Sequence, residues 1–197
     1  MSHRGLISFL LLWGASTPVW AAGTARWAAG TTVAGEASGR VASVAARRFE
    51  ATLDPFEEVP AISSDAQGWI VLEVEPGGDV LRYELRYEGL EGRVSQAHLH
   101  FGQAGVNGGV LAWLCGTADA PGPADTPDCP DGGGVVSGKL SAGEVTGATA
   151  QGVPPGGFQA LLQALRAGLV YANVHSSAFP GGEARGQLRG PRQGAAR

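Results

Sequence analysis

The segment LRYELRYE, residues 81–88, decides the fold class of this protein. Its leucines and tyrosines alternate strictly with arginines and glutamates. A period of two places the apolar side chains on one face of a β-strand and the charged side chains on the other. The apolar run at residues 68–75 precedes it, and the sequence Pro-Gly-Gly-Asp at 76–79 separates the two runs as a turn. Together the two runs predict an antiparallel β-hairpin with one dry face.

Further short strands are expected on both sides of this hairpin. They are predicted at residues 49–53, 94–101, 110–114, 134–140, 169–175 and 183–189. One helix is predicted from an apolar stripe at i, i+3, i+4 and i+7, formed by Phe158, Leu161, Leu162 and Leu165. Gly168 is expected to end this helix. Many short strands, abundant glycine and a single short helix predict an all-β protein, an antiparallel sandwich or small Greek-key barrel.

The N-terminal residues predict an exported protein. His3 and Arg4 precede an apolar run, and Val19-Trp20-Ala21 fits a small-x-small cleavage site. The apolar run of about 8–10 residues is too short to span a bilayer, which needs about 20. We expect a signal peptide at residues 1–21, a flexible linker at 22–48, one domain at 49–190 and a disordered tail at 191–197. The protein is then periplasmic or secreted, with no transmembrane segment after cleavage.

The charge pattern narrows the class of partner. The formal net charge is −4, and the segment from Phe49 to Gly190 is acidic with one lysine, Lys139. Nucleic-acid binding rests on neutralising phosphates with a basic surface, so a nucleic-acid partner is not expected. The chain has no G-x-S-x-G motif, so hydrolase chemistry is not supported either. The partner that remains is an unidentified protein or small ligand.

The two cysteines, Cys115 and Cys129, predict a disulfide because paired cysteines in exported proteins are oxidised. The alternative is a pair of thiolate metal ligands. Structural zinc sites use closely spaced C-x-x-C pairs, which this sequence lacks, so the disulfide is favoured.

The histidines are the candidate functional residues. His98 and His100 are spaced i and i+2, so on a strand they point to the same face. In the strand at 169–175, alternation places three residues opposite the apolar positions: Tyr171, Asn173 and His175. The last strand places three more on its outer face: Glu183, Arg185 and Gln187. If these strands are neighbours, the polar side chains gather on one wet outer face of the sheet.

Three interpretations of this cluster are open. One is a hydrogen-bonded network without a ligand, in which Glu183 and Arg185 form a surface ion pair. The second is a copper or zinc site of His98, His100 and His175. In it the imidazoles would be oriented by Tyr171, Asn173, Glu183 and Arg185. The third is a site for an organic ligand. Metal binding would weaken below roughly pH 6, where free imidazoles are protonated. No catalytic residue is predicted.

Several segments resemble the chordin-type (CHRD) domain family. They are Glu58-Val59-Pro60, Ala97-His98-Leu99-His100-Phe101-Gly102, Asn107-Gly108, Tyr171-Ala172-Asn173-Val174-His175, and residues 180–188, PGGEARGQL. The resemblance runs from about residue 49 to residue 190. It implies an immunoglobulin-like β fold found in secreted and surface proteins. We therefore expect an extracytoplasmic binding or structural module.

A shorter resemblance suggests an alternative function. The segment His98-Leu99-His100-Phe101-Gly102 is similar to the His-x-His strand of copper/zinc superoxide dismutases. This resemblance implies that His98 and His100 bind copper, with His175 as the third ligand. The chain has four histidines, and removal of residues 1–21 would leave three, so a second, bridged metal site is not expected. The alternative is thus a copper-dependent redox protein of dismutase type.

Overall fold

The structure is a computed structural model, and it describes residues 47–190. The predicted signal peptide at 1–21, nearly all of the predicted linker and the predicted tail at 191–197 lie outside the described residues. These three predictions therefore remain predictions.

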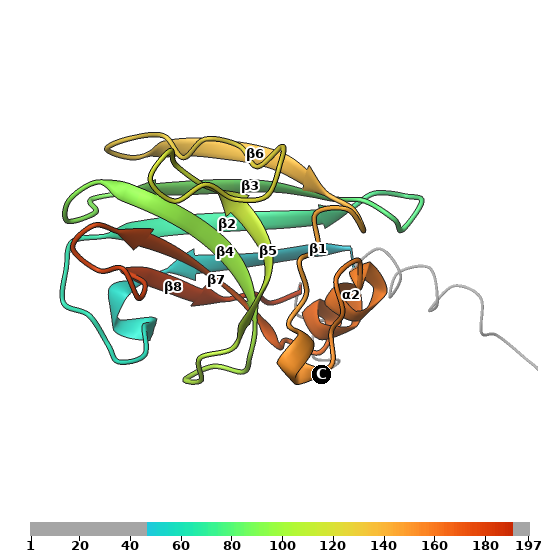
Figure 1. Ribbon diagram of the computed structural model, residues 1–197. Coiled ribbons are helices and arrows are strands. Elements are labelled where there is room, and N and C mark those ends of the chain that lie inside the picture. The colour runs from blue at the N-terminus through green and yellow to red at the C-terminus, as the bar shows by residue number, and fades with distance from the viewer. Residues whose placement is uncertain (1–46, 191–197) are drawn as a thin grey trace, which may run out of the picture. The chain divides into compact units, whose positions relative to one another are not determined.

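The described residues form two four-stranded antiparallel sheets packed face to face (Figure 1). The first sheet has the order β1 (Arg48–Leu53), β2 (Gln67–Val74), β3 (Leu81–Glu88) and β6 (Gly134–Leu140). The second has the order β5 (Gly109–Cys115), β4 (Val94–Phe101), β7 (Val170–Ser176) and β8 (Ala184–Gln187). The prediction of an all-β antiparallel sandwich is confirmed.

The hairpin of β2 and β3 explains why the sheets pack. In β3 the leucines and tyrosines are buried while the arginines and glutamates are exposed. The register places Leu85 opposite Ile70 and Leu81 opposite Val74, and all four side chains are buried in the core. Burial of an aliphatic side chain contributes roughly 1.5–3 kcal/mol, so the dry face of this hairpin holds the two sheets together.

Helical segments lie at the ends of the sandwich. The helix α2 (Phe158–Arg166) buries the predicted stripe, and Gly168 follows it at φ +69°, the left-handed conformation that commonly ends helices. Two 3-10 turns, η1 (Pro55–Glu57) and η2 (Thr149–Gln151), lie in loops. In the described part of the chain, none of these helices has the length and apolar character that crossing a membrane requires.

The observed strands differ from the predicted ones only at their ends. β1 begins at Arg48, one residue inside the predicted linker, and β8 is shorter than the predicted strand at 183–189. Glu50 still pairs with Arg189 as an isolated bridge, so this segment stays beside β1.

The predicted disulfide is present between Cys115 and Cys129. It closes a loop whose ends are 14 residues apart in sequence, and both sulfur-bearing side chains are buried. The thiolate-ligand alternative is therefore wrong.

Removing this disulfide should lower the free energy of unfolding by about 3 kcal/mol, because the unfolded chain regains the entropy of an open loop of this length. Urea unfolding of the Cys115→Ser/Cys129→Ser double variant, compared with the oxidised chain, measures the loss. A difference below about 1 kcal/mol would show that the bridge constrains the unfolded chain far less than the loop-entropy model predicts.

Candidate metal centre

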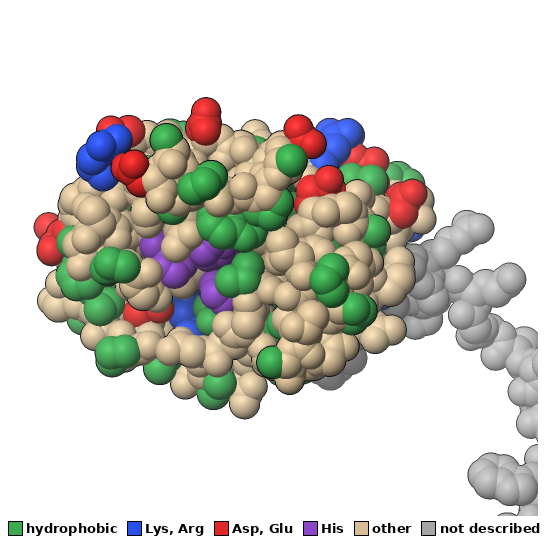
Figure 2. Space-filling model, viewed as in Figure 1, with side chains coloured by type: hydrophobic (Ala, Val, Ile, Leu, Met, Phe, Trp, Pro, Cys, Tyr) green, Lys and Arg blue, Asp and Glu red, His purple; other side chains and the backbone are tan. Residues whose placement is uncertain are grey.

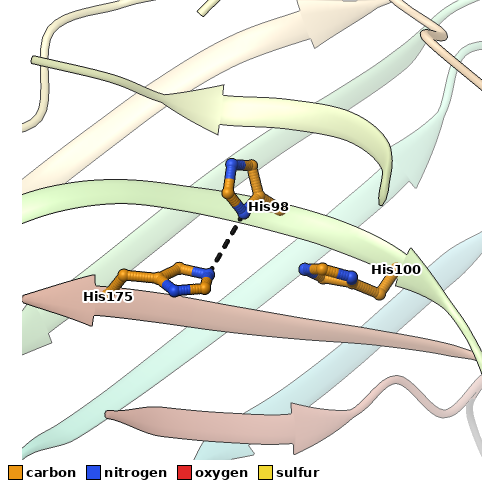
Figure 3. A group of neighbouring side chains, drawn as sticks. All are labelled: His98, His100 and His175. Atoms are coloured by element: carbon orange, nitrogen blue, oxygen red, sulfur yellow. Dashed lines mark hydrogen bonds between the residues drawn. The ribbon is translucent and has the colours of Figure 1, made fainter. Parts of the chain in front are cut away.

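Three imidazoles converge on one point of the second sheet. β4 and β7 are hydrogen-bonded neighbours, with His98 opposite Asn173 and His100 opposite Tyr171. One ring nitrogen from each of His98, His100 and His175 lies within 4.8 Å of the other two. Figure 3 shows two rings from β4 and one from β7 pointing toward a common centre. The predicted adjacency of these strands is confirmed.

The prediction that this face is wet is wrong. His98, His100 and His175 are only 3%, 8% and 6% exposed. Loops cover the face, and one tie between them is the hydrogen bond that Asn107 Nδ2 donates to the Val59 carbonyl at 3.0 Å. Figure 2 shows histidine atoms at the floor of a small surface opening, with charged atoms close beside them. The site is therefore buried from bulk water but reachable from one side.

Two backbone carbonyls determine where the imidazole protons lie. The carbonyl of Gly108 is 2.9 Å from His100 Nδ1, and that of Pro180 is 2.9 Å from His175 Nδ1. A carbonyl only accepts, so each Nδ1 carries the proton and each Nε2 presents a lone pair. Metal-bound histidines typically donate the other ring N–H in this way, which fixes the tautomer and the ring orientation.

The third imidazole completes the network. His98 Nδ1 is 3.2 Å from His175 Nε2, so His98 donates there and its Nδ1 points to the centre of the cluster. Among the described residues, the buried atoms His98 Nε2 and His100 Nε2 have no hydrogen-bond partner. Buried polar atoms without a partner are uncommon in native proteins, and an ion at the centre of the cluster would account for the unpartnered Nε2 of His100.

Burial keeps all three imidazoles neutral. Desolvation lowers the pKa of His98 to about 3, and repulsion between protonated imidazoles, with His175 and His100 so close, lowers it further. Desolvation also lowers the pKa of His100 to about 4, against the opposing effect of its hydrogen bond to Gly108. The pKa of His175 is lowered for the same reason. Neutral imidazole is the form that binds metals, so the expected loss of ligands below roughly pH 6 moves to more acidic pH.

Tyr171 holds His100 in two ways. Its ring is stacked on the imidazole, with centroids 4.7 Å apart and planes 3° from parallel. Its hydroxyl accepts the Gly108 N–H at 3.1 Å, and the carbonyl of the same glycine accepts from His100. The stacked tyrosine ring thus fixes the plane of the imidazole, and the hydrogen bonds through Gly108 fix the position of its Nδ1 edge.

Arg185 holds the loop between β4 and β5 in place over the site. Its guanidinium carbon lies 3.5 Å from the centre of the Tyr171 ring, a cation–π contact. It donates to Asn107 Oδ1 at 3.0 Å and to the Val106 carbonyl at 2.6 Å, both in the loop between β4 and β5. The side chain is 2% exposed. Gln187, the next outward residue of β8, donates to the carbonyls of Gly102, Gly168 and Val170.

The predicted surface ion pair of Glu183 with Arg185 is wrong. Both residues are buried, and no salt bridge joins them within residues 47–190. The Glu183 carboxylate instead accepts the backbone N–H of Glu91 at 2.7 Å. Glu183 therefore anchors the loop before β4, and no hydrogen bond joins it to an imidazole in the described chain.

Three residues of the site, Trp113, Glu58 and Asn107, were not predicted. Trp113 of β5 packs edge-on against His98, with ring centroids 4.3 Å apart. Glu58 is buried beside the site, and burial raises its pKa while the charge of Arg185 lowers it. Alternation in the run at 110–114 does not single out Trp113. Glu58 and Asn107 lie in two motifs of the family resemblance, and that resemblance was the available signal.

The second sheet of this β-sandwich thus carries a buried cluster of three neutral imidazoles, which is a candidate metal centre. The model of the CHRD domain matches residues 49–188, and the chain belongs to this family. No curated protein and no solved structure matches the chain.

The neutral state of the imidazoles predicts a pH-dependent stability of the metal-free protein. The unfolded chain binds protons on histidine near pH 6.5, whereas the folded chain does so only near pH 3–4 for His98 and His100. The free energy of unfolding is therefore highest above pH 6.5 and falls as the pH drops toward 4. Between pH 7.5 and pH 5, His98 and His100 should each lower the free energy of unfolding by about 2 kcal/mol.

Urea unfolding in the presence of EDTA, at pH 7.5 and pH 5, measures this effect. The His98→Gln variant is the control, because it lacks one titrating imidazole and should show a smaller decrease. Equal stability at both pH values for the parent chain would mean that the imidazoles take up protons in the folded chain as readily as in the unfolded chain.

Proposed function

We propose that this protein is an exported CHRD-domain binding module that holds one transition-metal ion, copper or zinc, through His98, His100 and His175. The observation that carries the proposal is the convergence of three buried imidazole nitrogens within 4.8 Å of one another. Imidazole is a preferred ligand of both Cu²⁺ and Zn²⁺.

The state of the ligands supports the proposal. His100 and His175 are held as Nδ1–H tautomers by backbone carbonyls, so both direct a lone pair inward. His98 has to move its proton from Nδ1 to Nε2 to do the same, a change that leaves the ring neutral. Because no ligand has to lose a charge-bearing proton, binding at neutral pH does not compete with protons.

Tryptophan fluorescence offers a direct test. Trp113 contacts His98, so Cu²⁺ bound at the cluster should quench its emission, with saturation at one ion per chain. The Trp113→Phe variant is the matched control, since it keeps the three ligands and should lose the quenched component. Quenching that is identical after His98, His100 and His175 are all replaced by alanine would refute the proposed site.

Export is supported by the N-terminal sequence and by the disulfide, which forms in oxidising compartments. Mass spectrometry of the protein recovered from the periplasm or medium should find a mature chain that begins at Ala22. Recovery of a chain that retains Met1 in the cytosol, with both cysteines reduced, would contradict export.

A redox function of dismutase type is the alternative. It is favoured by the geometry of two histidines from one strand and a third from its neighbour, as the similarity to the His-x-His strand of superoxide dismutases implies. Superoxide consumption by the copper-loaded chain that disappears in His98→Ala would support it. If a chain shown to hold copper does not consume superoxide, the redox function is refuted and the binding module is the remaining proposal.

A further inference from the structure

Asn173 lies inside the imidazole cluster. It is 3% exposed and faces His98 across the β4–β7 ladder. Its side-chain oxygen, Oδ1, is 3.1 Å from His175 Nε2, the same nitrogen that receives the proton of His98. The amide therefore approaches the inward-facing lone pair of a proposed metal ligand.

The orientation of the amide follows from its other neighbour. Asn173 Nδ2 is 2.9 Å from the position that a Cβ atom on Gly182 would occupy. The Glu58 carboxylate lies beside the same position, so the amide nitrogen and the carboxylate are neighbours. The interaction with Asn173 lowers the pKa of Glu58, as expected when an N–H group faces a carboxylate. An amide turned the other way would set two oxygens against each other, so Oδ1 faces the imidazoles.

Counting protons shows that the contact between Asn173 Oδ1 and His175 Nε2 has no donor. The only proton of neutral His175 lies on Nδ1, bonded to the Pro180 carbonyl. The amide oxygen carries no proton, and the His98 proton occupies the separate contact at 3.2 Å. Two electron-rich atoms thus face each other at 3.1 Å in a buried place, an arrangement that a cation between them would stabilise.

We propose that the amide oxygen of Asn173 is a fourth donor to the metal ion, beside the three imidazoles. This inference rests on the proposed function. A set of three nitrogens and one oxygen completes the four-coordination common for zinc and suits a divalent ion better than Cu⁺, which prefers soft ligands. Four protein donors describe a closed site, typical of metal holding, whereas catalytic sites keep a position open.

The sharpest test uses the two asparagines of the chain, Asn107 and Asn173. The full mature chain is labelled with ¹³Cγ-asparagine and titrated with Zn²⁺, which is diamagnetic, while both side-chain carbonyl signals are followed by NMR. We expect the Asn173 signal to shift and saturate at one equivalent. The Asn107 signal should stay in place, because that amide is bonded to Arg185 and Val59 and serves as the internal control.

The outcomes separate this inference from the proposed function. If the histidine ring signals shift on adding Zn²⁺ while the Asn173 carbonyl does not, the fourth donor is refuted and the three-histidine site stands. If neither the histidine nor the Asn173 signals respond, both proposals fail together.

A variant measures how much the fourth donor contributes to the Zn²⁺ affinity. Asn173→Leu keeps the volume but removes the oxygen, and we expect the Zn²⁺ affinity to fall roughly 10-fold or more, the range in which loss of a supporting group lies. Unchanged affinity in a variant that melts as cooperatively as the parent chain would overturn the inference. If the variant does not fold, the NMR titration of the parent chain decides alone.

Discussion

Replacing His100 by alanine should weaken Cu²⁺ binding by roughly 100-fold or more, above the 10–100-fold that loss of an outer hydrogen-bond partner costs. The variant loses the imidazole whose Nε2 lacks any hydrogen-bond partner in the described chain and whose Nδ1 is tied to the Gly108 carbonyl. The two remaining imidazoles hold the ion less tightly. Competition against a chelator of known affinity, at pH 7.5, measures the change.

Gln96→Ala provides the control for this experiment. Gln96 precedes His98 on the same strand and pairs with His175 in the ladder, but it is no part of the imidazole cluster. We expect this variant to bind Cu²⁺ as the parent chain does. Equal affinities for the parent chain and His100→Ala would mean that the imidazoles of the second sheet do not form the binding site.

Replacing Arg185 by methionine should lower the free energy of unfolding by about 3–5 kcal/mol, the cost of breaking a buried charged network on one side. The guanidinium is almost fully buried, lies over Tyr171 and donates to Asn107 and Val106. Without it the buried carboxyl of Glu58 loses its neighbouring positive charge, and the acceptors in the loop between β4 and β5 lose their donor. Urea unfolding of the metal-free protein gives the value.

Two further variants test whether the geometry and the buried position of the Arg185 guanidinium, and not its charge alone, account for this loss of stability. Arg185→Lys should recover only part of the loss, because an ammonium group lacks the planar fork that reaches two acceptors and stacks on a ring. Arg82→Met should cost less than about 1 kcal/mol, because its ion pair with Glu75 is exposed. A loss below about 1 kcal/mol for Arg185→Met would contradict the role of Arg185 in fastening the loops.

The strands were predictable because alternation is a local signal. In β3 each apolar residue is buried and each charged residue exposed, as the period of two indicates. The same rule placed His98, His100, Tyr171, Asn173 and His175 on the face opposite the core, and the sheet order then brought them together.

The burial of that face was not predictable from alternation. Its cover comes from loops far away in sequence, such as the one that Asn107 ties to Val59. A strand pattern reports which side chains share a face, but not which distant loop lies over them. For the same reason Arg185 was assigned to a surface ion pair, although its partners are loop carbonyls and an aromatic ring.

The residues of the proposed metal site were partly predictable. The His-x-His spacing and the resemblance to known families indicated the three histidines, and the structure places them within reach of one ion. The resemblance to superoxide dismutases implies no role for the amide of Asn173, and the tautomers of the imidazoles depend on carbonyls at Gly108 and Pro180. Such details depend on the packing of neighbouring strands and loops.

The most direct test of the central claim is pulsed EPR of the mature chain loaded with Cu²⁺, which counts the imidazoles bound to the ion. We expect one Cu²⁺ per chain with three coordinated imidazoles, and a smaller number of imidazoles in His100→Ala. A Cu²⁺ ion bound by fewer than two imidazoles, with a spectrum that the loss of His100 leaves unchanged, would contradict the claim.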